Sequence, residues 1–178
     1  VGGLAKTHLV KEIDALGGVM GYAADNNALQ YKTLNKTKGR AVWSTRTQVD
    51  KKTYPLFIQN EIKKNKLIDV VEDEVVDIQT KNNCVVGVSL KKGKKIHCEA
   101  IVVCCGTFSN GLIHIGSQVF SAGRFGEKNT KSVSDFLVGF GHSLIKLKTG
   151  TPPRISLKSI DMRFVELAKG DDIYTPLS

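Results

Sequence analysis

Small residues follow an apolar segment near the middle of the chain, an arrangement that suits the binding of a phosphorylated cofactor. The segment Ile96–Val103 leads into Cys105, Gly106 and Thr107. Glycine lets a backbone approach a phosphate closely, and threonine adds a hydroxyl group. If the segment is a strand buried on both faces of a parallel sheet, this turn lies at its carboxyl end, where α/β proteins place ligands. The pattern therefore predicts a ligand site at Gly106 and Thr107.

Positive charge is concentrated in two stretches of the chain. The 178 residues contain 26 Lys plus Arg against 17 Asp plus Glu, a formal net charge of +9. This excess favours an anionic partner, either nucleic acid or a phosphorylated cofactor. Every charged residue between Asn26 and Val49 is basic, and residues 123–154 are also rich in Lys and Arg. Two interpretations stay open for both stretches: contact with phosphates, or a plain solvated face.

Other catalytic or metal-binding patterns are not found in the sequence. The four cysteines form no Cys-x-x-Cys pair and the four histidines have no ligand spacing, so we expect reduced thiols and no metal site. The sequence contains no Gly-x-Gly-x-x-Gly turn and no Walker loop. We therefore expect either that no dinucleotide binds, or that the turn lies in a segment missing before Val1, as in a piece of a longer protein.

Helices and hairpins are predicted around these residues. Apolar residues at helical spacing predict a helix that ends at Gly17, a second helix over 50–64 with Asp50 as N-cap, and a third over 132–140. Residues 21–48 are expected to be irregular, with a short strand at 29–34. A further strand is expected over 143–148.

The clearest pattern lies between residues 68 and 104. Turns at Asn82-Asn83 and at Gly93 separate three strand-like segments, which predicts a three-stranded antiparallel layer. The fold class is therefore α/β, with part of a parallel sheet and this antiparallel layer. No apolar run approaches the ~20 residues of a membrane span.

Four strings of residues resemble the MnmG (GidA) family. This family is the flavin-containing subunit of the enzyme that builds 5-carboxymethylaminomethyl groups on the wobble uridine of tRNA. The strings are residues 2–18 (GGLAKTHLVKEIDALGG), 34–50 (LNKTKGRAVWSTRTQVD), 106–124 (GTFSNGLIHIGSQVFSAGR) and 147–154 (LKTGTPPR). The chain departs from the family pattern at Ala5, where a glycine is usual, and at Phe125, where a small residue is usual.

The resemblance implies that the chain is an internal piece of a longer enzyme. Residues 1–150 would form the central part of a glutathione-reductase-like FAD-binding domain that lacks its Gly-rich turn, with 68–104 as its antiparallel layer. Residues 151–178 would begin the next segment or second domain. The catalytic cysteines would lie outside the chain, and the piece alone is expected to be inactive.

The resemblance also implies cofactors, partners and site residues. FAD would be the cofactor, NADH and a folate one-carbon donor the co-substrates, and tRNA the substrate. A GTPase subunit of the MnmE family and a second copy of the full-length protein would be partners, in the bacterial cytoplasm and away from membranes. The expected FAD contacts are Gly2, Gly3, Val75, Gly106, Thr107 and Thr130. The expected substrate or RNA contacts are Lys38, Arg46, Gln48, Lys148 and Arg154.

Two other functions stay open. A different FAD-dependent oxidoreductase could share the antiparallel layer and the Gly-Thr turn without the strings at 34–50 and 147–154. A non-catalytic RNA-binding module would need exposed aromatic rings among the basic residues. Tyr31 and Trp43 are the candidates in the first basic stretch.

Overall fold

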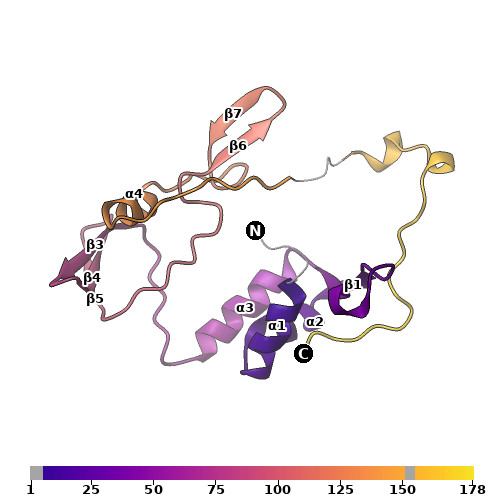
Figure 1. Ribbon diagram of the computed structural model, residues 1–178, viewed down its shortest axis with the longest axis horizontal. Coiled ribbons are helices and arrows are strands. Elements are labelled where there is room, and N and C mark those ends of the chain that lie inside the picture. The colour runs from indigo at the N-terminus through magenta and orange to yellow at the C-terminus, as the bar shows by residue number, and fades with distance from the viewer. Residues whose placement is uncertain (1–5, 151–154) are drawn as a thin grey trace. The chain divides into compact units, whose positions relative to one another are not determined.

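The structure is a computed structural model that describes residues 6–150 and 155–178. The chain forms two compact units, one built from residues 1–69 with 148–178 and the other from residues 70–147. Figure 1 follows the order of the elements along the chain. Gly2, Gly3 and Arg154, three of the expected site residues, lie outside the described residues.

The first unit has three helices. The end of the first and the start of the third lie where the sequence predicts caps, whereas the second was not predicted and overlaps residues expected to be irregular. Helix α1 (Lys6–Ala15) is followed by Gly17, whose φ of 85° is the left-handed cap expected from the glycine pair. Helix α2 (Val19–Asn26) follows at once, and α3 (Thr53–Lys64) begins after Asp50. The Asp50 carboxylate accepts hydrogen bonds from the backbone N–H groups of Lys52 and Thr53, at 2.7 and 2.9 Å. These bonds lower the pKa of Asp50.

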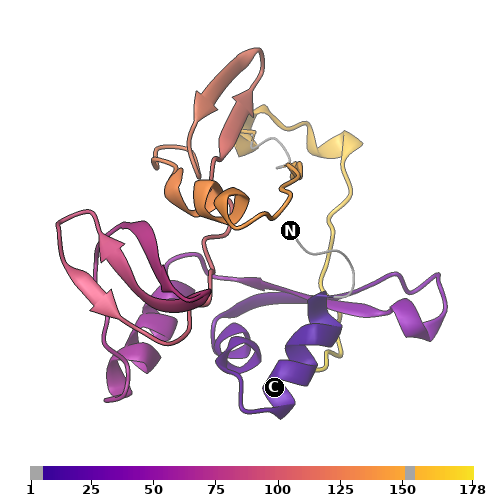
Figure 2. The ribbon, with the colours of Figure 1, turned by 60° about the vertical axis from the view of Figure 1, so that its left-hand side comes forward.

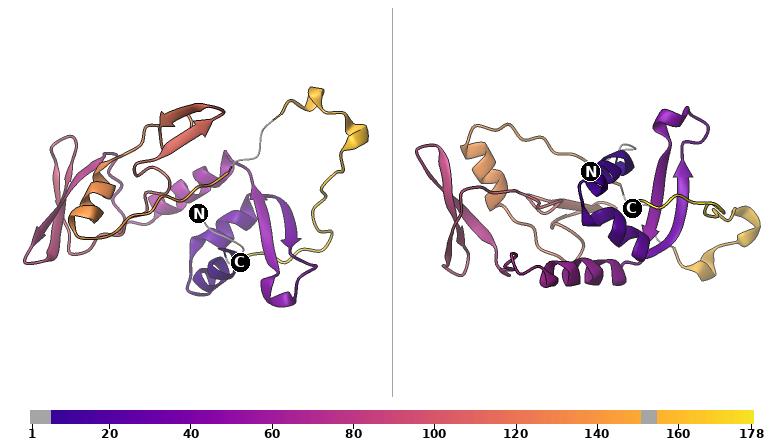
Figure 3. Two further views of the ribbon diagram at one scale, coloured as in Figure 1. Left: turned by 45° about the horizontal axis from the view of Figure 1, so that its top comes forward. Right: turned by 90° about the horizontal axis from the view of Figure 1, so that it is seen from below.

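An antiparallel hairpin completes the first unit and corrects the expectation that residues 21–48 are irregular. Strands β1 (Ala28–Leu34) and β2 (Ser44–Val49) pair directly, and the short 3-10 helix η1 (Arg40–Val42) lies at the tip. The tip projects away from α1 and α2 (Figure 3). The short strand expected at 29–34 is confirmed as β1, whereas β2 was not predicted, because its mostly polar residues remove the apolar alternation that identifies a strand.

The C-terminal segment lies along β1. The short 3-10 helices η2 (Leu157–Ser159) and η3 (Met162–Phe164) precede it. Asp171 donates its backbone N–H to the Tyr31 carbonyl at 2.8 Å and accepts the Thr33 N–H on its carboxylate at 2.7 Å. The rings of Tyr31 and Tyr174 stack with centroids 4.2 Å apart. The outer edge of β1 is therefore covered by the chain itself.

The second unit contains the predicted antiparallel layer. Its strands β3 (Val75–Lys81), β4 (Cys84–Leu90) and β5 (Lys95–His97) pair in the order β3-β4-β5. Asn82 and Asn83 take positive φ values of 52° and 60°, and Gly93 takes 91°. Both predicted turns and the three-stranded layer, which is visible in Figure 2, are confirmed.

The apolar strand predicted over 96–103 is wrong beyond His97. β5 ends there, and residues 98–105 form no strand. A strand needs a neighbour for its N–H and C=O groups. Cys98 still donates its N–H to the Val86 carbonyl at 3.3 Å, but no strand of the described residues pairs with the chain beyond it. Val102 is accordingly 86% exposed. All strand ladders in the described residues are antiparallel, so the parallel sheet expected around this segment is not seen.

Other parts of the second unit also differ from expectation. A hairpin of β6 (Leu112–Ile115) and β7 (Gln118–Ser121) turns at Gly116, where only loops were expected. Helix α4 (Ser132–Gly139) is confirmed, whereas residues 143–148 form no strand. No helix in the described parts is long and apolar enough to cross a membrane.

Candidate cofactor and substrate sites

Two of the expected FAD contacts, Val75 and Thr130, line one hollow of the second unit. The hollow has a volume of about 460 Å³ and is open to solvent. Val75 is the first residue of β3, Thr130 lies two residues before α4, and Val133 lies in the first turn of α4. Cys105 lines the hollow too, although we had expected it only to precede the ligand turn. Its position directly before Gly106 is the one sequence signal that could have identified it.

Backbone hydrogen bonds fix this hollow. Thr130 donates its N–H to the Phe108 carbonyl at 2.9 Å, and its own carbonyl accepts the Asn110 N–H at 2.7 Å. The Ser132 hydroxyl donates to the Val75 carbonyl at 2.7 Å, which ties the start of α4 to the start of β3. The hollow is therefore shaped by main-chain contacts between segments far apart in the sequence.

The Gly106-Thr107 turn lies beside the hollow and does not line it. Gly106 takes a φ of 56°, and a side chain placed there would meet no atom within 4 Å. The backbone at this residue is thus open to a ligand, as the sequence pattern predicts. The Thr107 hydroxyl donates to the Gly123 carbonyl at 2.9 Å, so its proton is already engaged.

The charges at the hollow suit the adenosine end of a dinucleotide better than its pyrophosphate. Glu72, Asp73 and Glu74 line it against Lys92 and Lys128, three carboxylates against two ammonium groups. Carboxylates accept hydrogen bonds from ribose hydroxyls and an adenine amine, and they repel phosphates. Sequence analysis missed these three residues because an acidic run beside a strand carries no distinctive signal.

Of the lysines near this hollow, Lys91 is paired with a carboxylate. It contacts Glu74 at 2.7 Å, and the hydrogen bond raises the pKa of the Lys91 ammonium. Lys92 donates its ammonium to the Glu72 carbonyl at 3.0 Å, a bond that leaves its charge in place. The hollow therefore keeps the two positive charges of Lys92 and Lys128 against three carboxylates.

The expected substrate contacts are distributed along the first unit. Arg46 and Gln48 are exposed on β2, two residues apart and so on one face of the hairpin. Lys38 is exposed at the hairpin tip, and Lys148 is exposed in an irregular segment. The structure therefore brings Arg46 and Gln48 together.

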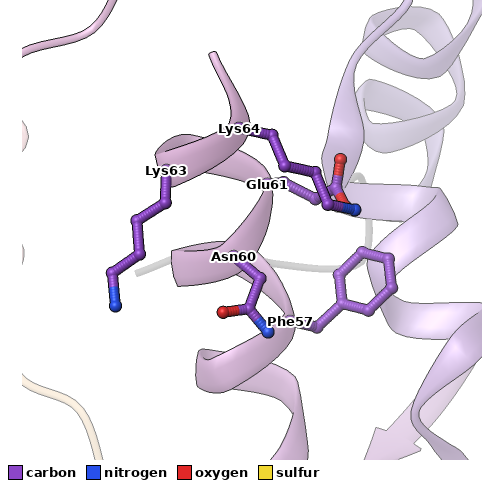
Figure 4. Close-up of a pocket in the computed structure, with 5 residues that line it drawn as sticks. All are labelled: Phe57, Asn60, Glu61, Lys63 and Lys64. Carbon is purple, nitrogen blue, oxygen red and sulfur yellow. The ribbon is translucent and has the colours of Figure 1, made fainter. Parts of the chain in front are cut away.

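A second hollow, of about 370 Å³, lies on α3 (Figure 4). Two of its charged groups satisfy each other, since Lys64 contacts Glu61 at 2.6 Å. Phe57 packs edge-on against Tyr22, with ring centroids 5.6 Å apart. Its other lining residues, Asn60 and Lys63, add no catalytic pair. The part of the chain that the structure describes holds no cluster of three or more His, Cys, Asp or Glu suited to a metal ion, and its four cysteines are free thiols.

Comparison with known proteins gives the family. The family model "Glucose inhibited division protein A" matches residues 1–178. The tRNA uridine 5-carboxymethylaminomethyl modification enzyme MnmG of Aquifex aeolicus (strain VF5) is 45% identical over 172 residues, 97% of this chain and 28% of that protein. The protein of the same name from Protochlamydia amoebophila (strain UWE25) is 43% identical over 171 residues, 96% of this chain and 27% of its own length.

A solved structure gives the same result for the fold. The chain superposes on Aquifex aeolicus GidA in its form I crystal with a TM-score of 0.87 at 44% identity, which covers 99% of this chain and 29% of that one. The chain thus spans between a quarter and a third of the length of these relatives. The match over all its residues and the shared fold confirm the resemblance predicted from the four strings: this chain belongs to the GidA family.

Proposed function

We propose that the chain is part of an FAD-dependent enzyme that installs a carboxymethylaminomethyl group at C5 of the wobble uridine of tRNA. The observation that carries this proposal is the identity of 45% over 97% of the chain with a protein named for that modification. The hollow at Val75 and Thr130 supports it, because two of the six residues that the family resemblance assigns to FAD line it.

FAD fits the hollow through its adenosine end. Val75 and Val133 offer apolar contacts for the adenine, and Thr130 offers a hydroxyl group. Gly106 and Thr107 would lie along the path of the pyrophosphate, where the bare backbone at Gly106 permits close approach. We assign Gly2 and Gly3 to the flavin ring. When bound, FAD supplies the redox chemistry of the reaction, with NADH and a folate one-carbon donor as its co-substrates.

tRNA is the proposed substrate, in the cytoplasm, where tRNA is found. The exposed cations at Lys38, Arg46, Lys148 and Arg154, with the amide of Gln48, would contact it. In the full-length protein we further propose a homodimer and a GTPase subunit of the MnmE family as partners. The reacting cysteines are assigned to parts of that protein outside these residues.

A chimera tests this function. The segment of the Aquifex aeolicus protein that aligns with this chain is replaced by residues 1–178, and modified uridine in tRNA is measured by mass spectrometry. We expect the chimera to form the modified nucleoside. A folded chimera that binds flavin and forms no modified uridine would refute the assignment.

The cofactor assignment has its own test in the same chimera. Thr130→Val removes the hydroxyl group at the hollow and should weaken FAD binding about fivefold, the effect of one neutral hydrogen bond of ~1 kcal/mol. Thr80→Val, on an exposed position of β3, is the matched control and should leave FAD binding unchanged. Equal FAD affinity in both variants would remove Thr130 from the site.

A further inference from the structure

The β1–β2 hairpin carries a set of cations that the protein itself hardly neutralises. Its five basic residues are Lys32, Lys36, Lys38, Arg40 and Arg46, and residues 27–49 contain no Asp or Glu. One carboxylate reaches it from elsewhere: Asp171 pairs with Lys36 at 2.9 Å. The other four form no ion pair with any residue that the structure describes.

Two of these cations face each other across the hairpin. Lys32 and Arg46 are directly opposite in the antiparallel register, so their side chains leave the same face. Like charges at opposed positions repel, and an anion between them removes that repulsion. The next pair along this face is Gln30 and Gln48. The Gln30 amide already donates to the Ala168 carbonyl at 3.2 Å, which leaves the Gln48 amide to donate to a phosphate oxygen. The face is therefore suited to an oxyanion.

An aromatic platform lies at the tip of the same hairpin. The guanidinium carbon of Arg40 lies 5.5 Å from the centroid of the Trp43 ring, and Trp43 is 39% exposed. The Trp43 indole N–H donates to the Lys38 carbonyl at 3.1 Å, and the Asn35 side-chain amide donates to the Val42 carbonyl at 3.2 Å. These bonds hold the ring in place before any ligand arrives, which reduces the entropy lost on binding.

The second aromatic candidate of the hairpin is not such a platform. Tyr31 stacks on Tyr174 with an angle of 6° between the rings, and its hydroxyl donates to Asp25 at 2.8 Å. The burial and the Asp25 bond raise the pKa of Tyr31 to about 12. Trp43 is thus the ring that is left to stack with a ligand.

We propose that this hairpin binds single-stranded RNA, with phosphates at Lys32 and Arg46 and an unpaired base stacked at Arg40 and Trp43. Unpaired bases stack on aromatic rings and on guanidinium planes, and a cationic strip follows the backbone. Trp43 and Arg46 are three residues apart, about 10 Å of extended chain, so one short RNA strand can reach both. An open, extended strip of this kind suits a polymer better than a small cofactor, whose sites are concave.

The choice of RNA rests on the proposed tRNA substrate, and the contact surface rests on the hairpin alone. Trp43 is the single tryptophan of the chain, so its emission reports on this site directly. The 178-residue chain is titrated with a ten-nucleotide unpaired RNA, with the same sequence as a duplex, and with inorganic polyphosphate. We expect the unpaired RNA to quench Trp43 emission and to bind at least tenfold more tightly than the duplex. Polyphosphate should compete for the cations without quenching.

Charge variants test the phosphate contacts. The double variant Lys32→Gln/Arg46→Gln should weaken binding of labelled RNA at least tenfold and reduce the slope of log K against log salt by about 1.4, the value for two single-strand phosphate contacts. Lys94→Gln/Lys95→Gln, on exposed residues of the β4–β5 turn, changes the net charge equally and is the matched control. Arg46→Gln alone should give half the change in slope, which keeps the test valid if the double variant does not fold.

The outcomes separate this inference from the proposed function. Equal affinity of the two double variants, quenching by polyphosphate as strong as by RNA, or a preference for duplex would each overturn the hairpin site. A chimera that modifies tRNA while its hairpin variants bind RNA normally would keep the enzyme assignment and reject the hairpin. The reverse result is also informative. If the chimera forms no modified uridine while unpaired RNA alone quenches the Trp43 emission of the chain, the enzyme assignment is rejected and the hairpin site is kept.

Discussion

Gly111 is a residue of the second unit at which a single added methyl group should be strongly destabilising. A Cβ at this position would lie 2.5 Å from the carbonyl oxygen of Ala122 and closer still to that of Thr107. Both obstructing atoms belong to the backbone, so neither can rotate away as the end of a side chain could. Gly111→Ala therefore has to separate two loop segments, one of which follows the Gly106 turn directly.

The cost can be worked from these contacts. Inserting a methyl group into a packed site costs about 1–3 kcal/mol. The Ala122 N–H donates to the Gly111 carbonyl at 3.1 Å, and separating the segments also loses this bond, at about 1 kcal/mol. The local opening free energy should therefore fall by about 2–4 kcal/mol, which is roughly a 30- to 700-fold change in an equilibrium constant.

Hydrogen exchange measures this change at a single amide. In Gly111→Ala the Ala122 amide should exchange faster by that factor, because local opening governs its exposure to solvent. Gly139→Ala is the matched control: it adds the same methyl group at the last residue of α4, where no atom lies within 4 Å. Ala122 amides that exchange at the same rate in both variants would refute the steric reasoning.

Three further expectations concern other parts of the chain. Hydrogen bonds from Thr33 and Lys36 lower the pKa of Asp171 from 3.8 to about 2. The stability that the ionised Asp171 carboxylate gives to the C-terminal segment is therefore fully present above pH 3.8 and is lost as the pH falls through 2. Exchange of the Thr33 amide against pH should show this loss, and Asp171→Asn should abolish the dependence. Asp50→Ala should destabilise the start of α3 by about 1 kcal/mol, measured at the Thr53 amide, with Asp50→Asn restoring most of it. The 178-residue chain should bind FAD weakly or not at all, because its described residues supply no Gly-rich turn at a helix N-terminus for the pyrophosphate; micromolar affinity by flavin fluorescence would contradict this.

The elements that could be predicted from the sequence are those fixed by neighbouring residues. Asn82-Asn83 takes positive φ because asparagine tolerates the left-handed region, and the turn alone sets the pairing of β3 with β4. Asp50 starts α3 through two bonds, from the backbone N–H groups two and three residues further on. These signals are local, so no knowledge of the rest of the fold is needed.

The elements that could not be predicted depend on distant partners. Strand β2 is defined by its pairing with β1, and its own residues show no apolar alternation that would identify a strand. The segment after His97 has the composition of a buried strand and forms none, since strand formation needs a neighbour that composition cannot supply. The cofactor hollow is similar: Ser132 and Val75 meet through one hydrogen bond, and only the family resemblance linked their regions beforehand.

The net charge of +9 favoured an anionic partner without distinguishing a cofactor from a nucleic acid, and the placement of charge now favours the nucleic acid. At the hollow, Glu72, Asp73 and Glu74 outnumber the lysines, and the ammonium of Lys91 is held by Glu74. On the β1–β2 hairpin the proportion is reversed, with one carboxylate for five cations. A cofactor phosphate would therefore depend on backbone N–H groups, whose dipoles do not raise the net charge. We attribute the surplus of Lys and Arg to the proposed RNA ligand, and raising the salt concentration should weaken RNA binding to the chain far more than flavin binding to the chimera.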